Sequence, residues 1–320
     1  MKFYKRKPIR YMKSRAQRDA LRRLSSFLDQ NNPRVVRFLV RMWDDQEAAI
    51  TYKELREAIL RGYMDEVTLE AWQHDYAVFF NTFLKDVLIT SCTAGGKDIA
   101  ETLLRGTDAY TPMLTGIDRW VDTHGAEFIT LMSDEAKEAV STMVRYTATG
   151  NMTVDELSRI IRPTIGLTAR QSVANAHHYE RVKEHVKSSL LNTNPKMSEA
   201  TAERQAAKRA KDSALRYAAR QHRQRAMTIA QTELSFAYNK GADDAVRGAM
   251  REGLLPRMQR QWCTSGDDRV CPICAALDGT IIEMDDDFPF PGRLLYEGQH
   301  ETPPAHPGCG CAVCYVEAEE

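Results

Sequence analysis

The sequence predicts a mainly α-helical protein, with an elongated helical body and a small C-terminal α+β module stapled by a metal ion. Apolar residues recur every three or four positions over most of residues 15–255, which is the period of amphipathic helices. Six of the seven cysteines lie between Cys263 and Cys314, at spacings that suit metal ligation. At 320 residues and 43% hydrophobic content, the chain can form a sizeable core.

Four regions follow from these patterns. We expect a basic arm over 1–14, an N-terminal helical region over 15–150, a helical core with one long helix over 151–255, and a Cys/His metal-binding module over 256–320. The arm mixes basic and aromatic side chains, a composition that suits phosphate contacts with some stacking. Its candidate contact residues are Lys2, Lys5, Arg6, Lys7 and Arg10.

Charge is unevenly distributed, although the formal net charge is zero. Residues 1–41 contain thirteen Lys or Arg and two Asp or Glu, and residues 170–225 contain thirteen and five. Residues 261–320 reverse the balance, with two basic and twelve acidic residues. Basic stretches of this kind either are solvated helix faces or bind a polyanion or an acidic partner.

Local signals place the first helices. We expect a helix over residues 14–29 that ends before Pro33, because proline disfavours helix at the residue before it. Thr51 and Glu54 form a capping box for a helix over 52–61, with glycine at its end.

A stripe of large apolar side chains predicts a helix buried in the core rather than a cofactor site. Its members are Leu69, Trp72, Tyr76, Phe79, Phe80, Phe83, Leu84, Val87 and Leu88. Cys92 is expected to be a small buried residue near the end of this helix. We expect Gly95-Gly96 to break the helix, and Ser133-Asp134-Glu135 to open a later one.

Capping signals recur in the middle of the chain. Thr153 with Glu156 predicts a second capping box, and Thr168 caps a helix over 169–190. His177-His178 lies in that helix without a Cys or carboxylate at ligand spacing, so we interpret the pair as surface histidines.

A very long helical pattern begins after Ser198 and continues to about Arg251. Its first half is basic, and its second half carries an apolar stripe on which Glu233 falls. A buried carboxylate needs a partner, for which we expect an arginine or a backbone N–H. A catalytic role is the alternative, but no matching acid, base or nucleophile accompanies Glu233, so we expect a structural role.

Two short strands are expected after the long helix, over Arg257–Cys263 and Ile281–Met284. In the first, Met258, Arg260 and Trp262 would share one face, although the arginine interrupts the apolar side. The three aspartates that follow the second strand lack the spacing of a calcium loop and are expected to be solvated.

Cysteine and histidine spacing predicts the metal site. A Cys-x-x-Cys turn presents Cys271 and Cys274, and His306, Cys309 and Cys311 offer a second half-site. Zinc takes four nitrogen or sulfur ligands in structural sites, and the spacer, rich in Asp, Pro and Gly, needs such a staple to fold. Cys271 and Cys274 form the core of the ligand set, and the other ligands are drawn from the remaining three.

Disulfides, or a catalytic thiol or metal, are the alternatives for these cysteines, with Cys263 and Cys314 as outliers to the ligand set. Disulfides are less favoured because the basic N-terminus lacks the apolar segment of a signal peptide and a reducing cytosol keeps thiols free. No stretch approaches the eighteen or so apolar residues of a membrane helix. We therefore expect a protein made and kept in the cytoplasm until it is assembled.

The motifs together resemble a known family. Trp262 is followed by Asp267-x-Arg269-Val270-Cys271-Pro272-x-Cys274-x-x-Leu277-Asp278-Gly279 and by Pro303-Pro304-x-His306-Pro307-x-Cys309-x-Cys311. This order resembles the C-terminal signature of the phage Mu protein F-like minor head, or head morphogenesis, proteins of tailed phages. Upstream, Ala230-Gln231-Thr232-Glu233 and Ile165-Gly166-Leu167-Thr168 are similar to segments of the same family. The resemblance covers roughly residues 150–315, and Gly310 departs from the basic residue usual there.

The resemblance implies a minor head protein of the procapsid and virion that lies near the portal and assists head assembly, DNA packaging or DNA delivery. The expected partners are portal protein, major capsid or scaffold protein, and phage DNA. The residues themselves favour a non-enzymatic protein with structural zinc, because they offer no constellation of nucleophile and base. The expected location is the virion interior, and the host cytoplasm during assembly, without membrane association. The basic arm would then contact portal or DNA.

Two other functions compete with this hypothesis. A cellular zinc-containing nucleic-acid-binding protein would use the same basic helices, but the acidic zinc region is unlike a DNA-reading finger. An enzyme is the other, because relatives of this family carry toxin or transferase domains after the signature. Only six residues follow Cys314, so we expect no such domain here.

Overall fold

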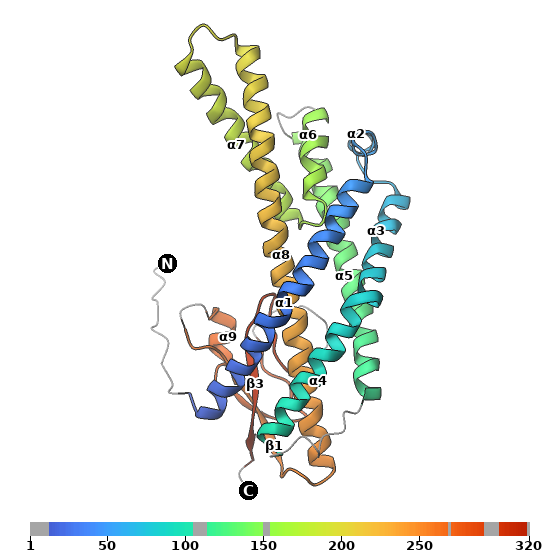
Figure 1. The fold of residues 1–320 in the computed structure, drawn as a ribbon, viewed down its shortest axis with the longest axis vertical. Coiled ribbons are helices and arrows are strands. Elements are labelled where there is room, and N and C mark those ends of the chain that lie inside the picture. The colour runs from blue at the N-terminus through green and yellow to red at the C-terminus, as the bar shows by residue number, and fades with distance from the viewer. Residues whose placement is uncertain (1–12, 105–113, 150–153, 268–269, 291–300, 319–320) are drawn as a thin grey trace. The chain divides into compact units, whose positions relative to one another are not determined.

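The computed structural model describes residues 13–104, 114–149, 154–267, 270–290 and 301–318 (Figure 1). The chain divides into two compact units, each assembled from segments far apart in the sequence. Unit 1 combines Met1–Val35, Thr82–Gly125 and Met227–Glu320, and unit 2 combines Val36–Asn81 and Ala126–Ala226. The four regions expected from the sequence are contiguous, whereas these units are not.

The mainly helical class is confirmed, with one small sheet near the C-terminus. The elements in chain order are α1 (Arg15–Ala49), α2 (Tyr52–Arg61), α3 (Glu66–Phe79), the π-helix η1 (Phe80–Leu84), α4 (Lys85–Thr102), α5 (Leu114–Thr149), α6 (Val154–Ile161), the 3-10 helix η2 (Arg162–Thr164), α7 (Ala169–Thr193), α8 (Glu199–Arg251), β1 (Met258–Cys263), α9 (Pro272–Leu277), β2 (Ile281–Glu283) and β3 (Ala312–Glu317). Within the part of the chain that is described, no helix combines the length and the apolar character needed to cross a membrane.

The prediction that the first helix ends before Pro33 is wrong, because α1 continues to Ala49. A proline in a helix interior costs about 3 kcal/mol, whereas burying one large aliphatic side chain stabilises by about 1.5–3 kcal/mol. Leu28, Val35 and Leu39 are all buried, so the apolar face continues across the proline. Burial of this face outweighs the lost hydrogen bond, and the helix does not end.

Helices α2 and α7 begin where their capping boxes predict. Thr51 accepts from the backbone N–H of Glu54, whose side chain accepts from the backbone N–H of Thr51. Gly62 ends α2 at φ 88°, where its N–H donates to carbonyls of the last turn. Thr168 and Gln171 form the same reciprocal pair at the start of α7. The box expected at Thr153 lies outside the described residues.

The predicted apolar stripe is buried over α3, η1 and α4, except for its first member, Leu69, which is half-buried. Gly95-Gly96 does not break α4, contrary to expectation. A Cβ on Gly95 would lie 1.9 Å from the carbonyl oxygen of Tyr238, and a Cβ on Gly241 would lie 1.9 Å from that of Cys92. These glycines let the α4 and α8 backbones approach each other closely, so they serve packing rather than termination.

The predicted helix start at Ser133-Asp134-Glu135 is also wrong, because these residues lie in the middle of α5. Ser133 donates its hydroxyl to the Ile129 carbonyl at 2.7 Å, which satisfies the side chain within the helix. Phe128 and Met132 are buried before that point and Ala136 is buried after it, and Glu135 pairs with Arg225 of α8. The helix passes through because its buried face continues.

Within unit 2, α7 and the first half of α8 are joined by ion pairs. Lys183 reaches Glu203 at 2.6 Å, and Lys187 reaches the same carboxylate at 3.0 Å. His178 Nε2 lies 2.9 Å from the Ser213 hydroxyl. Fully or almost fully buried alanines recur every fourth residue of α8: Ala202, Ala206, Ala210, Ala214 and Ala218. Such small side chains permit close helix packing.

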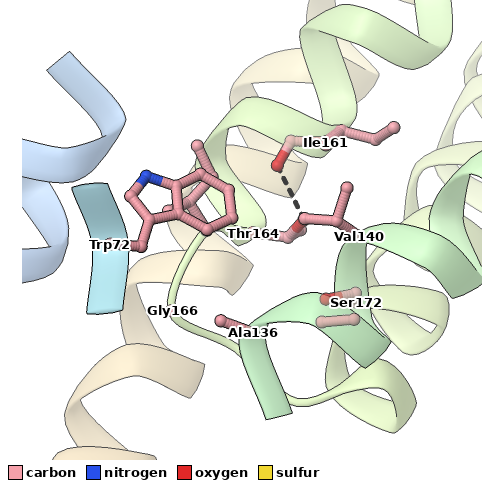
Figure 2. Close-up of a pocket in the computed structure, with 9 residues that line it drawn as sticks. Trp72, Ala136, Val140, Ile161, Thr164, Gly166 and Ser172 are labelled. Carbon is pink, nitrogen blue, oxygen red and sulfur yellow. Dashed lines mark hydrogen bonds between the residues drawn. The ribbon is translucent and has the colours of Figure 1, made fainter. Parts of the chain in front are cut away.

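Unit 2 also contains a small cavity beside the Trp72 ring (Figure 2). Its volume is about 10 Å³, which is at the lower limit for one water molecule. Thr164 lines it and donates its hydroxyl to the Ile161 carbonyl at 2.7 Å. This cavity is too small for an organic ligand.

The sheet belongs to unit 1 and has the order β2-β1-β3, with both pairs antiparallel. The two expected strands are confirmed, and Met258, Arg260 and Trp262 do share a buried face. Strand β3 was not predicted. Three of its six residues are fully or almost fully buried in succession, so no polar alternation marks it in the sequence.

Candidate metal centre

The first half of the centre is the start of α9. Cys271 is the N-cap residue of this helix, and its sulfur accepts from the backbone N–H of Cys274 at 3.3 Å. Pro272 follows at the first helical position, where its missing N–H costs nothing. Burial raises the pKa of the Cys271 thiol, but the hydrogen bonds from Cys274 outweigh burial and the net pKa is lowered. This turn therefore presents a sulfur that favours the thiolate.

The second half is the turn that ends in Cys309 and Cys311. His306 Nδ1 lies 3.0 Å from the Pro307 carbonyl, so this nitrogen carries the proton. The other ring nitrogen, Nε2, faces Cys271 at 3.0 Å and Cys274 at 3.3 Å. A histidine oriented by a backbone carbonyl through one nitrogen is the usual arrangement of a metal ligand.

The five predicted ligands come together in two groups that share Cys274. One group contains Cys271, Cys274 and His306, and the other contains Cys274, Cys309 and Cys311, with ligand atoms in each within 4.8 Å of one another. The sulfurs of Cys274 and Cys309 lie 3.7 Å apart. Two thiolates on one tetrahedral zinc, at Zn–S of about 2.3 Å, lie about 3.8 Å apart. These residues could hold a metal ion.

Proton sharing among the same groups keeps negative charge on sulfur. Hydrogen bonds from Cys274 and Cys311 hold the pKa of Cys309 well below its usual range. The hydrogen bond to Cys309 raises the pKa of Cys274, which burial raises further. Cys309 also raises the pKa of His306 to about 9. A thiolate is the form of cysteine that binds metals.

Helix α8 holds the second half-site in place. Gln231 donates to the Gly308 carbonyl at 2.8 Å, and the Gly308 N–H donates to the Thr232 hydroxyl at 2.8 Å. This pair of bonds gives the Ala-Gln-Thr-Glu segment of the sequence a physical role. Gly310 lies against the same side chain, since a Cβ there would be 3.4 Å from Gln231 Nε2.

About two turns of α8 further on, Asn239 holds the backbone after the last ligand. Its amide donates to the Cys311 carbonyl at 3.3 Å, and its carbonyl oxygen accepts from the Val313 N–H at 3.1 Å. The sequence reasoning did not select Asn239. The signal available was a polar residue close to the apolar stripe of α8.

The sheet docks on α8 through a buried ion pair that was also missed. Arg260 bonds Asp243 at 2.8 Å and 2.7 Å, and neither side chain is exposed. Tyr315 of β3 donates to the same carboxylate at 3.2 Å, and Arg247 pairs with it at 3.0 Å. Burial and the neighbouring Asp243 raise the pKa of Tyr315. The arginine that interrupts the apolar face of β1 is thus fully satisfied.

Glu233 is buried, as expected, but its contact is a histidine. His124 Nε2 lies 2.5 Å from its carboxylate, whereas we expected an arginine or a backbone N–H. Trp120 stacks on the His124 ring at 4.8 Å, and Phe236 meets that ring edge-on at 5.1 Å. Among the described residues, Glu233 belongs to no group of possible metal ligands.

A cavity of about 400 Å³ borders the cluster. Its walls include Leu21, Ser25 and Asp29 of α1 on one side and Cys271 and His306 on the other. Small solutes can therefore come close to the ligand atoms.

The predicted basic contacts Lys2, Lys5, Arg6, Lys7 and Arg10 lie outside the described residues. The first described lysine, Lys13, pairs with Asp278 at 3.0 Å. Asp278 also accepts from the Thr264 N–H at 2.9 Å. The Lys13 pair therefore places the residues just before α1 on the C-terminal module.

Residues 163–314 match the family described as phage Mu protein F like protein. Over these residues, the chain is similar to the phage Mu protein F-like family. The matched region contains the whole Cys/His cluster and the α8 side chains that hold it. Similarity to this family supports a role in phage head morphogenesis and a location in the virion. Comparisons with curated proteins and with solved structures gave no match.

Proposed function

We propose that this phage Mu protein F-like chain is a non-enzymatic minor head protein of a tailed phage, associated with the portal and with packaged DNA. Its C-terminal module would be held together by one structural zinc ion. The observation that carries the proposal is the Cys/His cluster, which lies within the family-matched region and is fixed to α8 by Gln231 and Thr232.

Zinc suits the donor set, because thiolate sulfur and imidazole nitrogen are its preferred ligands in structural sites. The proposed ligands are Cys271, Cys274, His306 and Cys309. Cys309 is favoured over Cys311 because its sulfur lies 3.7 Å from Cys274 and hydrogen-bonds His306 as well. Four protein ligands leave no open position for substrate, so the ion serves the fold rather than catalysis.

The small core around the cluster explains why a metal is needed. Trp262, Leu277 and Phe288 are its large buried side chains, and cysteines make up much of the remainder. So small an apolar core stabilises a module weakly. Metal binding free energy then becomes folding free energy.

Contact with packaged DNA is supported by the first half of α8 in unit 2. Six of its basic residues are exposed, while its alanines are buried on the opposite side: Arg204, Lys208, Arg209, Arg216, Arg220 and Arg223. Exposed guanidinium and ammonium groups in a row contact phosphates without reading sequence.

The test is co-expression with the portal, scaffold and major capsid proteins of the same phage, followed by purification of the assembled heads. We expect the chain in the heads at few copies, together with about one zinc per chain by elemental analysis. A cellular nucleic-acid-binding protein would bind DNA but stay out of the heads. Absence from the heads and from portal complexes would overturn the proposal.

A further inference from the structure

Two cysteines outside the metal cluster lie against each other. The sulfurs of Cys263 on β1 and Cys314 on β3 are 2.6 Å apart, and both residues are buried. In the strand register, Cys263 is opposite Ala312 and Cys314 is opposite Gln261. The two cysteines are therefore diagonal neighbours on one face of an antiparallel pair, which is within reach for side chains.

The Cys263 and Cys314 sulfurs are not two ligands of one metal ion. Zinc-bound thiolates lie about 3.8 Å apart, as the Cys274 and Cys309 sulfurs nearly do at 3.7 Å. Within the part of the chain that is described, neither Cys263 nor Cys314 belongs to a group of three or more possible ligands. A sulfur pair this close instead needs only a small movement to reach the bonding distance of about 2.05 Å.

We propose that Cys263 and Cys314 form a disulfide that ties β1 to β3 when the folded protein meets a low-molecular-weight disulfide. One cysteine thiolate attacks that reagent and releases one small thiolate, which leaves a mixed disulfide. The second cysteine thiolate then attacks the protein sulfur of this mixed disulfide and releases the other small thiolate. The two cysteines lose two electrons and two protons in total, and the reagent takes up the electrons as two thiols.

The disulfide reagent reaches the two buried thiols when the edge of the sheet opens. Strand β3 pairs only with β1 among the described strands, and Cys263 is the last residue of β1. Edge segments open locally at lower free energy than the core does. The hydrogen bond to Cys314 and burial raise the pKa of Cys263, so the closed sheet protects both thiols and exchange follows opening.

The position of the bond gives it an effect on the module. The loop between Cys263 and Cys314 contains all five predicted metal ligands. Closing a loop of this length restricts the unfolded chain, and we expect unfolding of the module to shift upward by roughly 5–10 °C. The proposal depends on neither the portal nor the DNA part of the proposed function.

The test uses the full-length zinc-loaded protein, reduced and then transferred into buffer with oxidised glutathione. Thiols are trapped under denaturing conditions and mapped by mass spectrometry, and zinc is measured in parallel. We expect two of the seven thiols to be lost, a mass decrease of about 2 Da, a bridged peptide pair containing Cys263 and Cys314, and unchanged zinc. Cys263→Ser and Cys314→Ser should each keep the partner thiol free, whereas Cys92→Ser should still form the bond.

Two results would overturn the proposal. One is that both thiols stay free under conditions that oxidise the cluster cysteines. The other is that each carries only a glutathione adduct. Because both readouts come from the unsubstituted protein, they remain decisive even if a serine variant fails to fold.

Discussion

Arg260 of β1 and Asp243 of α8 meet in a two-point ion pair from which solvent is excluded on both sides. Removing one member leaves the other charge buried and uncompensated, which costs about 3–5 kcal/mol. We expect Arg260→Met to lower the free energy of unfolding by that amount, measured by denaturant titration with tryptophan fluorescence.

Arg257 provides the matched control for that substitution. It pairs with Glu283 at 2.9 Å on the same sheet but is 67% exposed. Surface pairs contribute about 0–1 kcal/mol, so Arg257→Met should change stability little. Equal losses of unfolding free energy in the two variants would show that the buried Arg260 pair contributes no more to stability than the exposed Arg257 pair.

Gly95→Ala and Gly241→Ala test the close approach of α4 and α8. Each new methyl group would overlap a backbone carbonyl at 1.9 Å, which forces the helices apart. We expect each substitution to destabilise by at least about 1–3 kcal/mol. Gly116→Ala in α5 is the control, since nothing lies within 4 Å of its Cβ and alanine favours helix by about 1 kcal/mol. Stabilisation by either of the first two would contradict the packing argument.

The fourth metal ligand can be decided by two serine substitutions. Cys309→Ser should lose zinc on dialysis, as should Cys271→Ser and Cys274→Ser, whereas Cys311→Ser should retain about one zinc per chain. Loss of zinc should expose residues 256–320 to protease while the helical body stays resistant. Zinc retention by the Cys309 variant together with loss by the Cys311 variant would reverse the assignment.

Thr232→Val tests the support that α8 gives to the half-site. The Gly308 N–H would lose its acceptor, which costs about 1–3 kcal/mol, and the loss of an outer contact weakens metal affinity about 10–100-fold. A competitive chelator titration measures this affinity. Thr130→Val is the control, since Thr130, like Thr232, donates its hydroxyl to the carbonyl four residues earlier in its helix but lies at an exposed position. Identical metal affinities in the two variants would show that Thr232 does not support metal binding.

The basic arm is tested by changing Lys2, Lys5, Arg6 and Lys7 to glutamine. If these residues contact phosphates, DNA affinity falls, and the slope of log affinity against log salt decreases by about 3–4. Lys53→Gln with Arg61→Gln removes charge from α2 instead and should leave the slope unchanged. Binding of the arm variant that matches the original protein at low salt would mean that the arm is only a solvated segment.

Sequence patterns predicted the helix starts that depend only on neighbouring residues. The capping boxes at Thr51 and Thr168 begin their helices because each satisfies its N–H groups within four residues. Pro33 and Gly95 were misinterpreted as helix ends for the opposite reason. Their outcome depends on burial against segments distant in sequence, which a local signal does not contain.

The candidate site divides in the same way. The five Cys and His residues could be selected from spacing alone, because metal ligation demands those residue types on tight turns. Their supports, Asn239 and Asp243, are ordinary helix residues whose partners lie on the sheet or the loop before it. Such roles become visible only when the elements are packed together.

The discontinuous composition of unit 1 has a consequence for synthesis on the ribosome. Its first segment ends at Val35 and its last begins at Met227, so about 190 residues must be translated between them. At 5–20 residues per second this takes roughly 10–40 s. During that interval the apolar face of the nascent N-terminal segment, with Leu24 and Leu28, lacks the C-terminal segment of its unit. Folding of unit 1 is therefore completed only after its last segment has left the ribosome, and a chaperone that covers this face would raise the yield of folded protein.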